Sequence, residues 1–200
     1  MSADEPATRR ELLIYGAGIA GAALLVPASA LAAGGGTGEG EAARLQRLMS
    51  IELLMLYTYS QVIASSLLGP GARRALAPLR ANEEAHVRAL GARLSALGGA
   101  APRAPATVTE ANRDLAHREV SGRLGHLKGA KDALRLLLAV ERVTVGAYFV
   151  ALTKLEDPGL IKLAAEIMAN DAQHEAIIGG LLYPGKAGQA VPYGLVQGVQ

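Results

Sequence analysis

Apolar residues recur at three- and four-residue steps through four long segments of this 200-residue chain, and this periodicity constrains the fold more than any other feature. The period is that of an α-helix with one apolar face. Each segment ends at a short stretch that contains glycine or proline, so residues 42–182 are predicted to form four helices of about 20–27 residues. The predicted stripes are Leu45, Met49, Glu52, Leu56, Tyr59 and Ile63; Leu76, Leu79, Glu83, His86, Leu90, Leu94 and Leu97; Leu134, Leu138, Glu141, Val145, Tyr148, Leu152 and Leu155; and Leu160, Ala164, Ile167, Asp171, His174, Ile178 and Leu181.

The turns between these segments predict how the helices pair. Gly69-Pro70-Gly71 and Asp157-Pro158-Gly159 are short turns, which join neighbouring helices into antiparallel hairpins. The connection between the hairpins, about residues 98–130, is too long for a tight turn, and a short helix is predicted within it around Thr109–Leu124. The predicted fold is therefore all-α, a four-helix bundle of two antiparallel hairpins joined by one long crossover.

The composition suits packed helices and excludes several classes of function. Hydrophobic residues make up 50% of the chain but aromatic residues only 4%, so the core must be aliphatic. The absence of cysteine excludes disulfides, thiolate metal sites and iron–sulfur clusters, and any metal must be held by oxygen and nitrogen. A formal net charge of +2 gives too weak a field to favour nucleic acid as a partner.

Six ionisable residues occupy stripe positions where a simple bundle would place leucine: Glu52, Glu83, His86, Glu141, Asp171 and His174. Burying an unpaired carboxylate is costly, and none of the four acids has a Lys or Arg four residues away. Glu84 shows the contrast, because Arg80 and Arg88 lie four residues to either side of it, as on a solvated helix face. Glu166 has Lys162 in the same relation. Intrahelical ion pairs therefore do not account for the six stripe residues.

The polar residues repeat with the same spacing in both hairpins. Glu52 is followed by Tyr59 and then by Glu83-x-x-His86, and Glu141 is followed by Tyr148 and then by Asp171-x-x-His174. In order and spacing, about residues 42–182 resemble the ferritin-like di-metal carboxylate family, especially its rubrerythrin-like members. Asp171 departs from the family pattern, which has Glu at that position.

The resemblance implies two metal ions held by Glu52, Glu83, Glu141 and Asp171, with His86 and His174 each binding one of them. Four carboxylates balance two divalent cations, and this donor set suits iron first, manganese next, and also zinc. Spacing does not assign bridging and terminal ligands. Two alternatives stay open at this point: Glu175 could replace Asp171 if the fourth helix is rotated, or the pattern could persist in a bundle that has lost its metals.

Other polar residues of the pattern carry less information. Tyr59 and Tyr148 lie two turns from their glutamates and either donate hydrogen bonds to the ligands or pack in the core. His117 and His126 stand among basic residues of the crossover and are expected to be solvated. No catalytic residue is assigned from the sequence.

Residues 1–32 are predicted to be a signal peptide. Arg9-Arg10 precede an uncharged apolar stretch, and Ala28-Ser29-Ala30 and Ala30-Leu31-Ala32 are small-residue cleavage sites. The paired arginines resemble a twin-arginine export signal, with Leu12 where Phe is usual. The alternative is an uncleaved membrane anchor. Either interpretation predicts export to the periplasm, cell envelope or exterior.

The remaining segments are a Gly-rich linker at residues 33–41 and a predicted extended C-terminal tail at residues 183–200. The tail is too rich in Gly and Pro to supply the fifth helix of cage-forming ferritins, and no Cys-rich electron-transfer segment exists. The sequence favours an exported di-iron or di-manganese protein that reacts with oxygen, peroxide or ferrous ion, a ferroxidase- or peroxidase-like oxidoreductase. The alternative is a non-catalytic exported bundle with a stress-protective, scaffold or binding role. The expected partners are a small oxidant or metal ion, with a homodimer left open.

Overall fold

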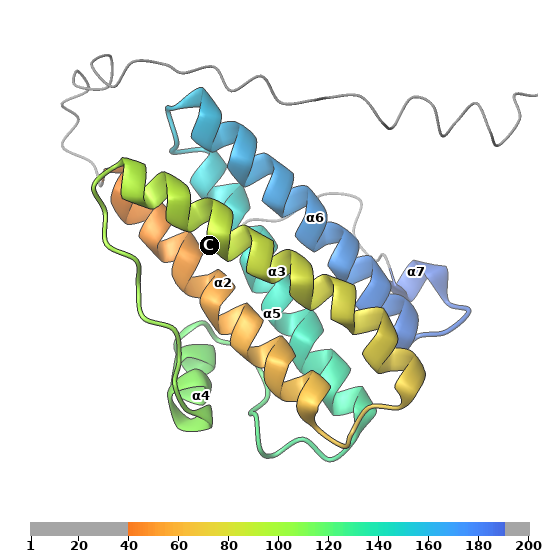
Figure 1. Cartoon of the computed structure of the whole chain (residues 1–200). Coiled ribbons are helices and arrows are strands. Elements are labelled where there is room, and N and C mark those ends of the chain that lie inside the picture. Colours follow the sequence, from red (N-terminus) through yellow and green to blue (C-terminus); the bar gives the residue numbers. More distant parts are fainter. Residues whose placement is uncertain (1–39, 191–200) are drawn as a thin grey trace, which may run out of the picture. The chain divides into compact units, whose positions relative to one another are not determined.

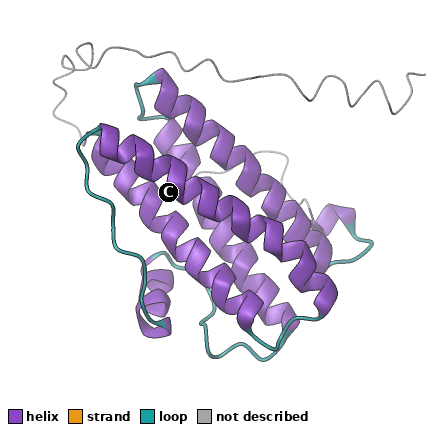
Figure 2. Ribbon diagram, in the orientation of Figure 1, coloured by secondary structure: helices purple, strands orange, loops and turns teal. Residues whose placement is uncertain are grey.

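The computed structural model describes residues 40–190. The signal peptide, nearly all of the linker and the last ten residues of the tail lie outside the described residues, so the predictions about them stay predictions. The helices of the described part are α2 (Glu41–Ala64), α3 (Pro70–Ala96), α4 (Val108–His117), α5 (Ala130–Leu152), α6 (Pro158–Leu182) and α7 (Ala187–Ala190). Residues 40–190 contain no strand (Figure 2), which confirms the all-α prediction.

Four long helices form the bundle. Helix α2 packs against α3 and α5 packs against α6, which are the two predicted hairpins, and α2·α5 and α3·α6 contacts close the bundle (Figure 1). The crossover from α3 to α5 carries α4, which packs against α2. None of the described helices is both long enough and apolar enough to span a membrane.

The helix ends follow from local chemistry. Pro70 and Pro158 stand in the first turns of α3 and α6, where proline's missing N–H costs no hydrogen bond. The Asp157 side chain accepts a hydrogen bond from the Leu160 N–H at 2.9 Å and caps α6. Thr107 caps helix α4, because its Oγ1 accepts a hydrogen bond from the Glu110 N–H at 3.1 Å, and the Glu110 side chain accepts from the N–H of Ala106, just before the cap, at 2.7 Å.

The buried core consists of two apolar clusters with a polar layer between them. One cluster includes Leu54 and Tyr59 of α2 and Ile178 of α6, and the other includes Leu45 of α2 and Ile167 of α6. Glu52 lies between the two clusters along α2, and the polar stripe residues of the other three long helices fall in the same interval. The apolar side chains above and below thus remove the layer from bulk water.

Three details differ from the sequence-based expectations. The short crossover helix ends at His117, not near Leu124, because the backbone leaves the helical conformation at Glu119 (φ 57°) and Gly122 (φ 113°). Leu56, Ile63, Leu97, Leu152 and Leu181 are only partly buried. Val62 and Leu182 are buried at the neighbouring positions. Within the tail, α7 forms one helical turn where extended chain was expected.

Candidate metal centre

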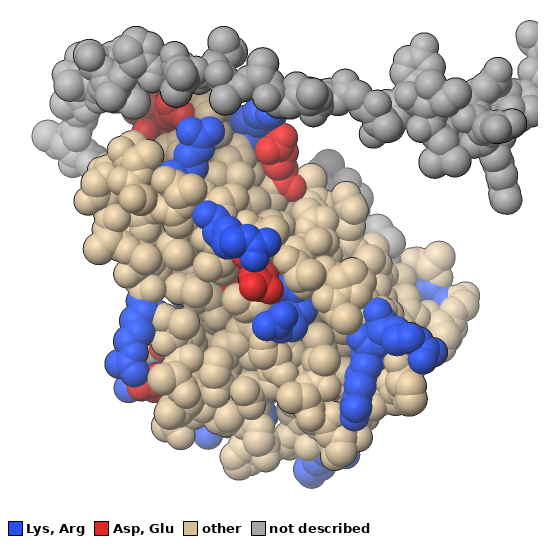
Figure 3. Space-filling view, in the orientation of Figure 1, with Lys and Arg blue, Asp and Glu red and all other residues tan. Residues whose placement is uncertain are grey.

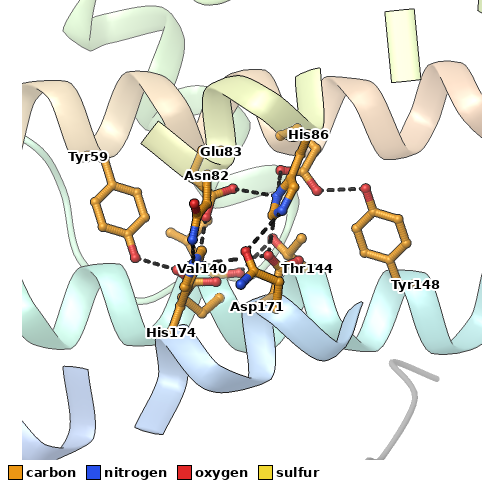
Figure 4. Close-up of polar contacts among 12 residues, drawn as sticks. Tyr59, Asn82, Glu83, His86, Val140, Thr144, Tyr148, Asp171 and His174 are labelled. Atoms are coloured by element: carbon orange, nitrogen blue, oxygen red, sulfur yellow. Dashed lines mark hydrogen bonds and ion pairs between the residues drawn. The ribbon is translucent and has the colours of Figure 1, made fainter. Parts of the chain in front are cut away.

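All six ionisable stripe residues converge in the polar layer (Figure 4). Glu52 comes from α2, Glu83 and His86 from α3, Glu141 from α5, and Asp171 and His174 from α6. The four carboxylic acids have 0% relative exposure, His174 has 1%, and His86 has 8%. The structure therefore brings together every residue that the sequence proposed as a ligand, on the inner faces of four different helices.

The donor atoms form two overlapping groups, each compact enough to surround one ion. One group is Glu52, Glu83, His86 and Asp171, and the other is Glu83, Glu141, Asp171 and His174, with the ligand atoms of each group within 4.8 Å of one another. Glu83 and Asp171 belong to both groups. The geometry thus makes these two acids candidates for bridging ligands, which the spacing of the sequence left unassigned.

The spacing of the donor atoms around the histidines fits a bound cation. His86 Nδ1 lies 3.5 Å from Glu52 Oε2, 3.4 Å from Glu83 Oε2 and 3.5 Å from Asp171 Oδ1. Atoms that share one ion at about 2.0–2.2 Å stand about 3–3.5 Å from each other. In the other group, His174 Nδ1 lies 2.8 Å from Glu83 Oε1, 3.3 Å from Glu141 Oε1 and 3.9 Å from Asp171 Oδ1.

Most of these donor atoms have no hydrogen-bond partner. Within residues 40–190, nine buried side-chain nitrogen or oxygen atoms lack a partner, and all but Arg44 Nε belong to the six cluster residues. They are Glu52 Oε2, both Glu83 oxygens, His86 Nδ1, Glu141 Oε2, both Asp171 oxygens and His174 Nδ1. Buried polar atoms are normally satisfied, so a concentration of unpaired acceptors aimed at one space fits a cation ligand set.

The two tyrosines reach across the bundle. Tyr148 of α5 donates a hydrogen bond to Glu52 Oε1 on α2 at 2.6 Å, and Tyr59 of α2 donates to Glu141 Oε1 on α5. Each tyrosine therefore orients the glutamate of the opposite hairpin, at the two ends of the cluster in Figure 4. Both are buried in the core as well, so the packing role and the hydrogen-bonding role hold together.

Two asparagines complete the site, and the sequence pattern alone did not identify them. Asn170 Oδ1 accepts a hydrogen bond from His86 Nε2 at 3.1 Å, and the Asn82 amide lies 3.1 Å from His174 Nε2. Each asparagine precedes the acid of one acid-x-x-His motif and contacts the histidine of the other. Engaging Nε2 fixes each ring with Nδ1 facing the carboxylates. The repeated pattern Asn-acid-x-x-His was the available signal.

Burial and mutual contacts shift the pKa values of the acids in opposite directions. Burial raises the pKa of Glu52 to about 8 and that of Glu141 to about 7. Burial and the charges of Glu52 and Glu141 hold the pKa of Asp171 well above its usual range. Burial alone would also raise the pKa of Glu83, but the close approach of the His174 and His86 rings outweighs it and lowers the value to about 2.

The histidines respond to the same acids. Burial lowers the pKa of His86, but its close contacts with the Glu52 and Glu83 carboxylates outweigh burial and raise the value to about 10. The pKa of His174 rises to about 9 against burial, through Glu141 and Glu83. Without a metal ion, protons on the histidines and on some carboxylic acids thus compensate the excess negative charge of the layer.

Glu84 and Glu166, two acids with a basic residue four positions away, form ion pairs with those basic residues as the sequence predicted. Glu84 contacts Arg80 at 3.7 Å and Arg88 at 3.4 Å on the surface. Glu166 pairs with Lys162 at 3.5 Å. Lys, Arg, Asp and Glu side chains are dispersed over the face shown in Figure 3 and form no continuous patch there.

Glu175 does not replace Asp171 in the cluster. Its Oε2 accepts a hydrogen bond from Arg142 Nε at 3.3 Å outside the cluster, whereas Asp171 is fully buried within it. Helix α6 therefore has the rotation that its apolar stripe predicts. His117 and His126 are exposed in the crossover, as expected for solvated residues.

Comparison with known proteins agrees with the fold. The chain is similar to a conserved hypothetical protein from Mycobacterium tuberculosis in its crystal structure, with a TM-score of 0.56 and 23% identity over 68% of this chain and 93% of that chain. No curated protein matches the sequence. The sequence model of the ferritin-like domain matches residues 40–184, most of the chain. The chain therefore belongs to the ferritin-like domain family.

Proposed function

We propose that the polar layer binds two redox-active divalent metal ions, iron or manganese. With these ions bound, the protein would react with oxygen or peroxide, or would oxidise ferrous ion. The observation that carries this proposal is the set of eight unpaired donor atoms on six buried residues. The four carboxylates, when ionised, carry a total charge of −4, which balances two ions of charge +2. Two adjacent redox metals would supply the two electrons that reduce peroxide to water.

The chain's own residues would divide the work of holding the ions. Glu83 and Asp171 lie in both donor groups and would bridge, whereas Glu52 with His86 and Glu141 with His174 would each complete one half. Because both histidines must present a neutral Nδ1 to a metal, binding would release the protons that these rings and the raised-pKa acids otherwise hold.

Residues around the ligands would orient them and limit access. Tyr59 and Tyr148 each hold one oxygen of a glutamate, leaving its other oxygen unpaired. Asn82 and Asn170 fix the imidazoles. Among the six cluster residues, His86 retains the most exposure, so small reactants would approach along its side of α3.

We also propose that the protein acts outside the cytoplasm. This rests on the sequence of residues 1–32 alone, with its paired arginines, apolar stretch and Ala-x-Ala sites. Intact-mass measurement of protein from the exported fraction should give a mature chain that begins near Leu31 or Ala33. A full-length chain held in the membrane fraction would instead identify an anchor.

Metal analysis followed by anaerobic ferrous titration tests the proposed activity. We expect about two irons per chain, one for each donor group, and rapid oxidation on adding oxygen or peroxide. Glu84→Gln is the matched control, since it removes a carboxylate adjacent to Glu83 that pairs on the surface. Binding of less than one metal per chain, with no oxidation above that of free iron, would favour the non-catalytic bundle.

A further inference from the structure

A second site is suggested by a pocket of about 250 Å³ between α2 and α5. None of the six cluster residues and neither buried tyrosine lines it. Four cationic side chains do: Arg44 and Arg47 from α2, Arg118 at the end of α4, and Lys154 just beyond α5. The apolar part of the lining includes Leu48, Ile51 and Val150. Three separate segments of the chain thus bring positive charge to one concave surface.

Among the described residues that line the pocket, none carries a carboxylate. Asp114 acts electrostatically on Arg118, and Arg118 Nη2 donates a hydrogen bond to Ser50 Oγ at 2.7 Å. Glu41, one turn before Arg44, accepts hydrogen bonds from the N–H groups of Glu156 and Asp157 at 3.0 and 2.8 Å. Oε1 of the acid nearest to Arg44 along α2 is therefore occupied by the turn between α5 and α6.

Arg44 provides the most specific sign of a missing partner. Its Nε is buried and has no hydrogen-bond partner among the described residues, and it is the one such atom outside the proposed metal centre. A buried donor without an acceptor costs free energy, and gathering like charges adds to that cost. A guanidinium recovers this cost when a carboxylate or phosphate binds it, because the anion accepts charge-assisted hydrogen bonds.

The apolar lining indicates that the ligand has more than a charged head. Ala147 and Val150 also line the pocket and are only partly buried, so a purely inorganic ion would leave this apolar surface in contact with water. At about 250 Å³ the pocket is smaller than the ~300–1,000 Å³ typical of sites for drug-sized ligands, so the ligand should be a small molecule.

We propose that this pocket binds a small organic anion, with a carboxylate or phosphate head at Arg44, Arg118 and Lys154 and a short apolar body against Ala147 and Val150. The site is separate from the proposed metal centre, and binding here requires no metal. A concave, partly buried arginine pair favours such a molecule over a flat lipid surface, which would contact exposed cations.

Calorimetric titration of the full chain with four probes tests the two-part ligand. Hexyl phosphate carries both parts, inorganic phosphate only the head, 1-hexanol only the body, and phosphatidylglycerol vesicles present the head on a lipid surface. We expect hexyl phosphate to bind at least about tenfold more tightly than inorganic phosphate or hexanol. Equal affinity for the two phosphates, or binding of the vesicles alone, would overturn the proposal.

Charge-neutral variants place the binding in this pocket. Arg44→Gln and Lys154→Gln should each weaken hexyl phosphate binding, by about tenfold for Arg44, which loses a charged hydrogen bond. Arg88→Gln makes the same change in net charge on α3 and should leave the affinity unchanged. Lys154 is exposed, so its variant should fold even if Arg44→Gln does not, and thermal melts identify any variant that is unfolded. Unchanged affinity in a folded Lys154→Gln protein would contradict the assignment.

Discussion

The two hairpins supply the same residues to the polar layer but differ in one bridging candidate. Glu83 of the first hairpin directs one oxygen toward each histidine, at 2.8 Å from His174 Nδ1 and 3.4 Å from His86 Nδ1. Asp171 of the second hairpin approaches both histidines with the same oxygen, at 3.5 and 3.9 Å. One methylene group therefore decides whether an acid at equivalent positions reaches the two halves of the site with two oxygens or with a single one.

The hairpins also depend on each other. Tyr59 and Asn82 of the first hairpin contact Glu141 and His174 of the second, and Tyr148 and Asn170 make the reciprocal contacts with Glu52 and His86. Neither hairpin alone orients its own ligands. A change in one hairpin is therefore expected to alter the half of the proposed metal centre that belongs to the other.

Neutralising the two bridging candidates should have the largest effect on metal content. Glu83→Gln removes the carboxylate that reaches both histidines, so we expect the metal content to fall from about two ions per chain to less than one. Asp171→Asn should retain about one ion. Metal analysis after equilibrium dialysis measures both, with Glu84→Gln as the control that retains the wild-type content. Equal losses in the Glu83 and Asp171 variants would show that the two acids contribute equally.

The pH dependence of stability in the metal-free protein should distinguish Glu83 from Asp171. Glu52 and Glu141, with pKa values raised to about 8 and 7, hold protons in the folded state that they lose near pH 4.5 when unfolded. His86 and His174 likewise hold protons up to about pH 10 and 9 rather than 6.5. The folded state thus binds more protons, and stability should fall as pH rises from about 4.5 to 10.

Glu83 has the opposite sign, because its lowered pKa stabilises the fold above about pH 4.5 and this contribution is lost as pH falls toward 2. In chelator, Glu83→Gln should therefore remove the loss of stability below about pH 4.5, whereas Asp171→Asn should retain that acid loss and flatten the alkaline loss. Urea unfolding across pH measures this. A metal-free protein whose stability is constant from pH 5 to 10 would contradict the assignment of protons to the layer.

Removing an asparagine should weaken the opposite half of the site. Asn82→Ala frees the His174 ring, and losing a hydrogen bond that orients a metal-binding histidine typically costs 10–100-fold in affinity. We expect this loss in a His86→Ala background, where the His174 half remains. In a His174→Ala background, Asn82→Ala should have no further effect. Calorimetric metal titration measures the pair, and Asn170→Ala should give the mirror-image result.

Lengthening Asp171 should make the two hairpins more alike. Asp171→Glu allows the second oxygen to reach toward a histidine, as Glu83 does, and we expect metal affinity to rise by about tenfold, the size of one charged contact. Asp171→Gln controls for the added volume at this fully buried position. A fall in affinity with an unchanged melting temperature would show instead that the shorter side chain belongs to the working geometry.

The six members of the polar layer could be predicted from the sequence because four acids within apolar stripes are too costly to bury unless protons or cations compensate their charge. The repeat of Asn82 and Asn170 beside the two motifs was visible, but an asparagine there is ordinary on a solvated face, and only the fold shows which histidine each one contacts. The apolar pattern also placed Leu56 and Ile63 in the stripe, where the structure buries Met55 and Val62. A helix buried on a wide face admits several apolar registers, whereas the polar residues fixed its rotation.

The smallest expected effect is the loss of one tyrosine hydroxyl. Tyr148→Phe and Tyr59→Phe keep the buried rings but leave an oxygen of Glu52 or Glu141 without its donor. Each should destabilise the fold by about 0.5–1.5 kcal/mol, the net contribution of a typical hydrogen bond. Tyr57→Phe is the matched control, since that tyrosine is only partly buried and packs against the apolar core. Because the tyrosine contacts are reciprocal, the two variants should cost similar amounts, and chemical unfolding measures the difference. A markedly larger cost for one tyrosine would show that the asymmetry of Glu83 and Asp171 extends to the ends of the site.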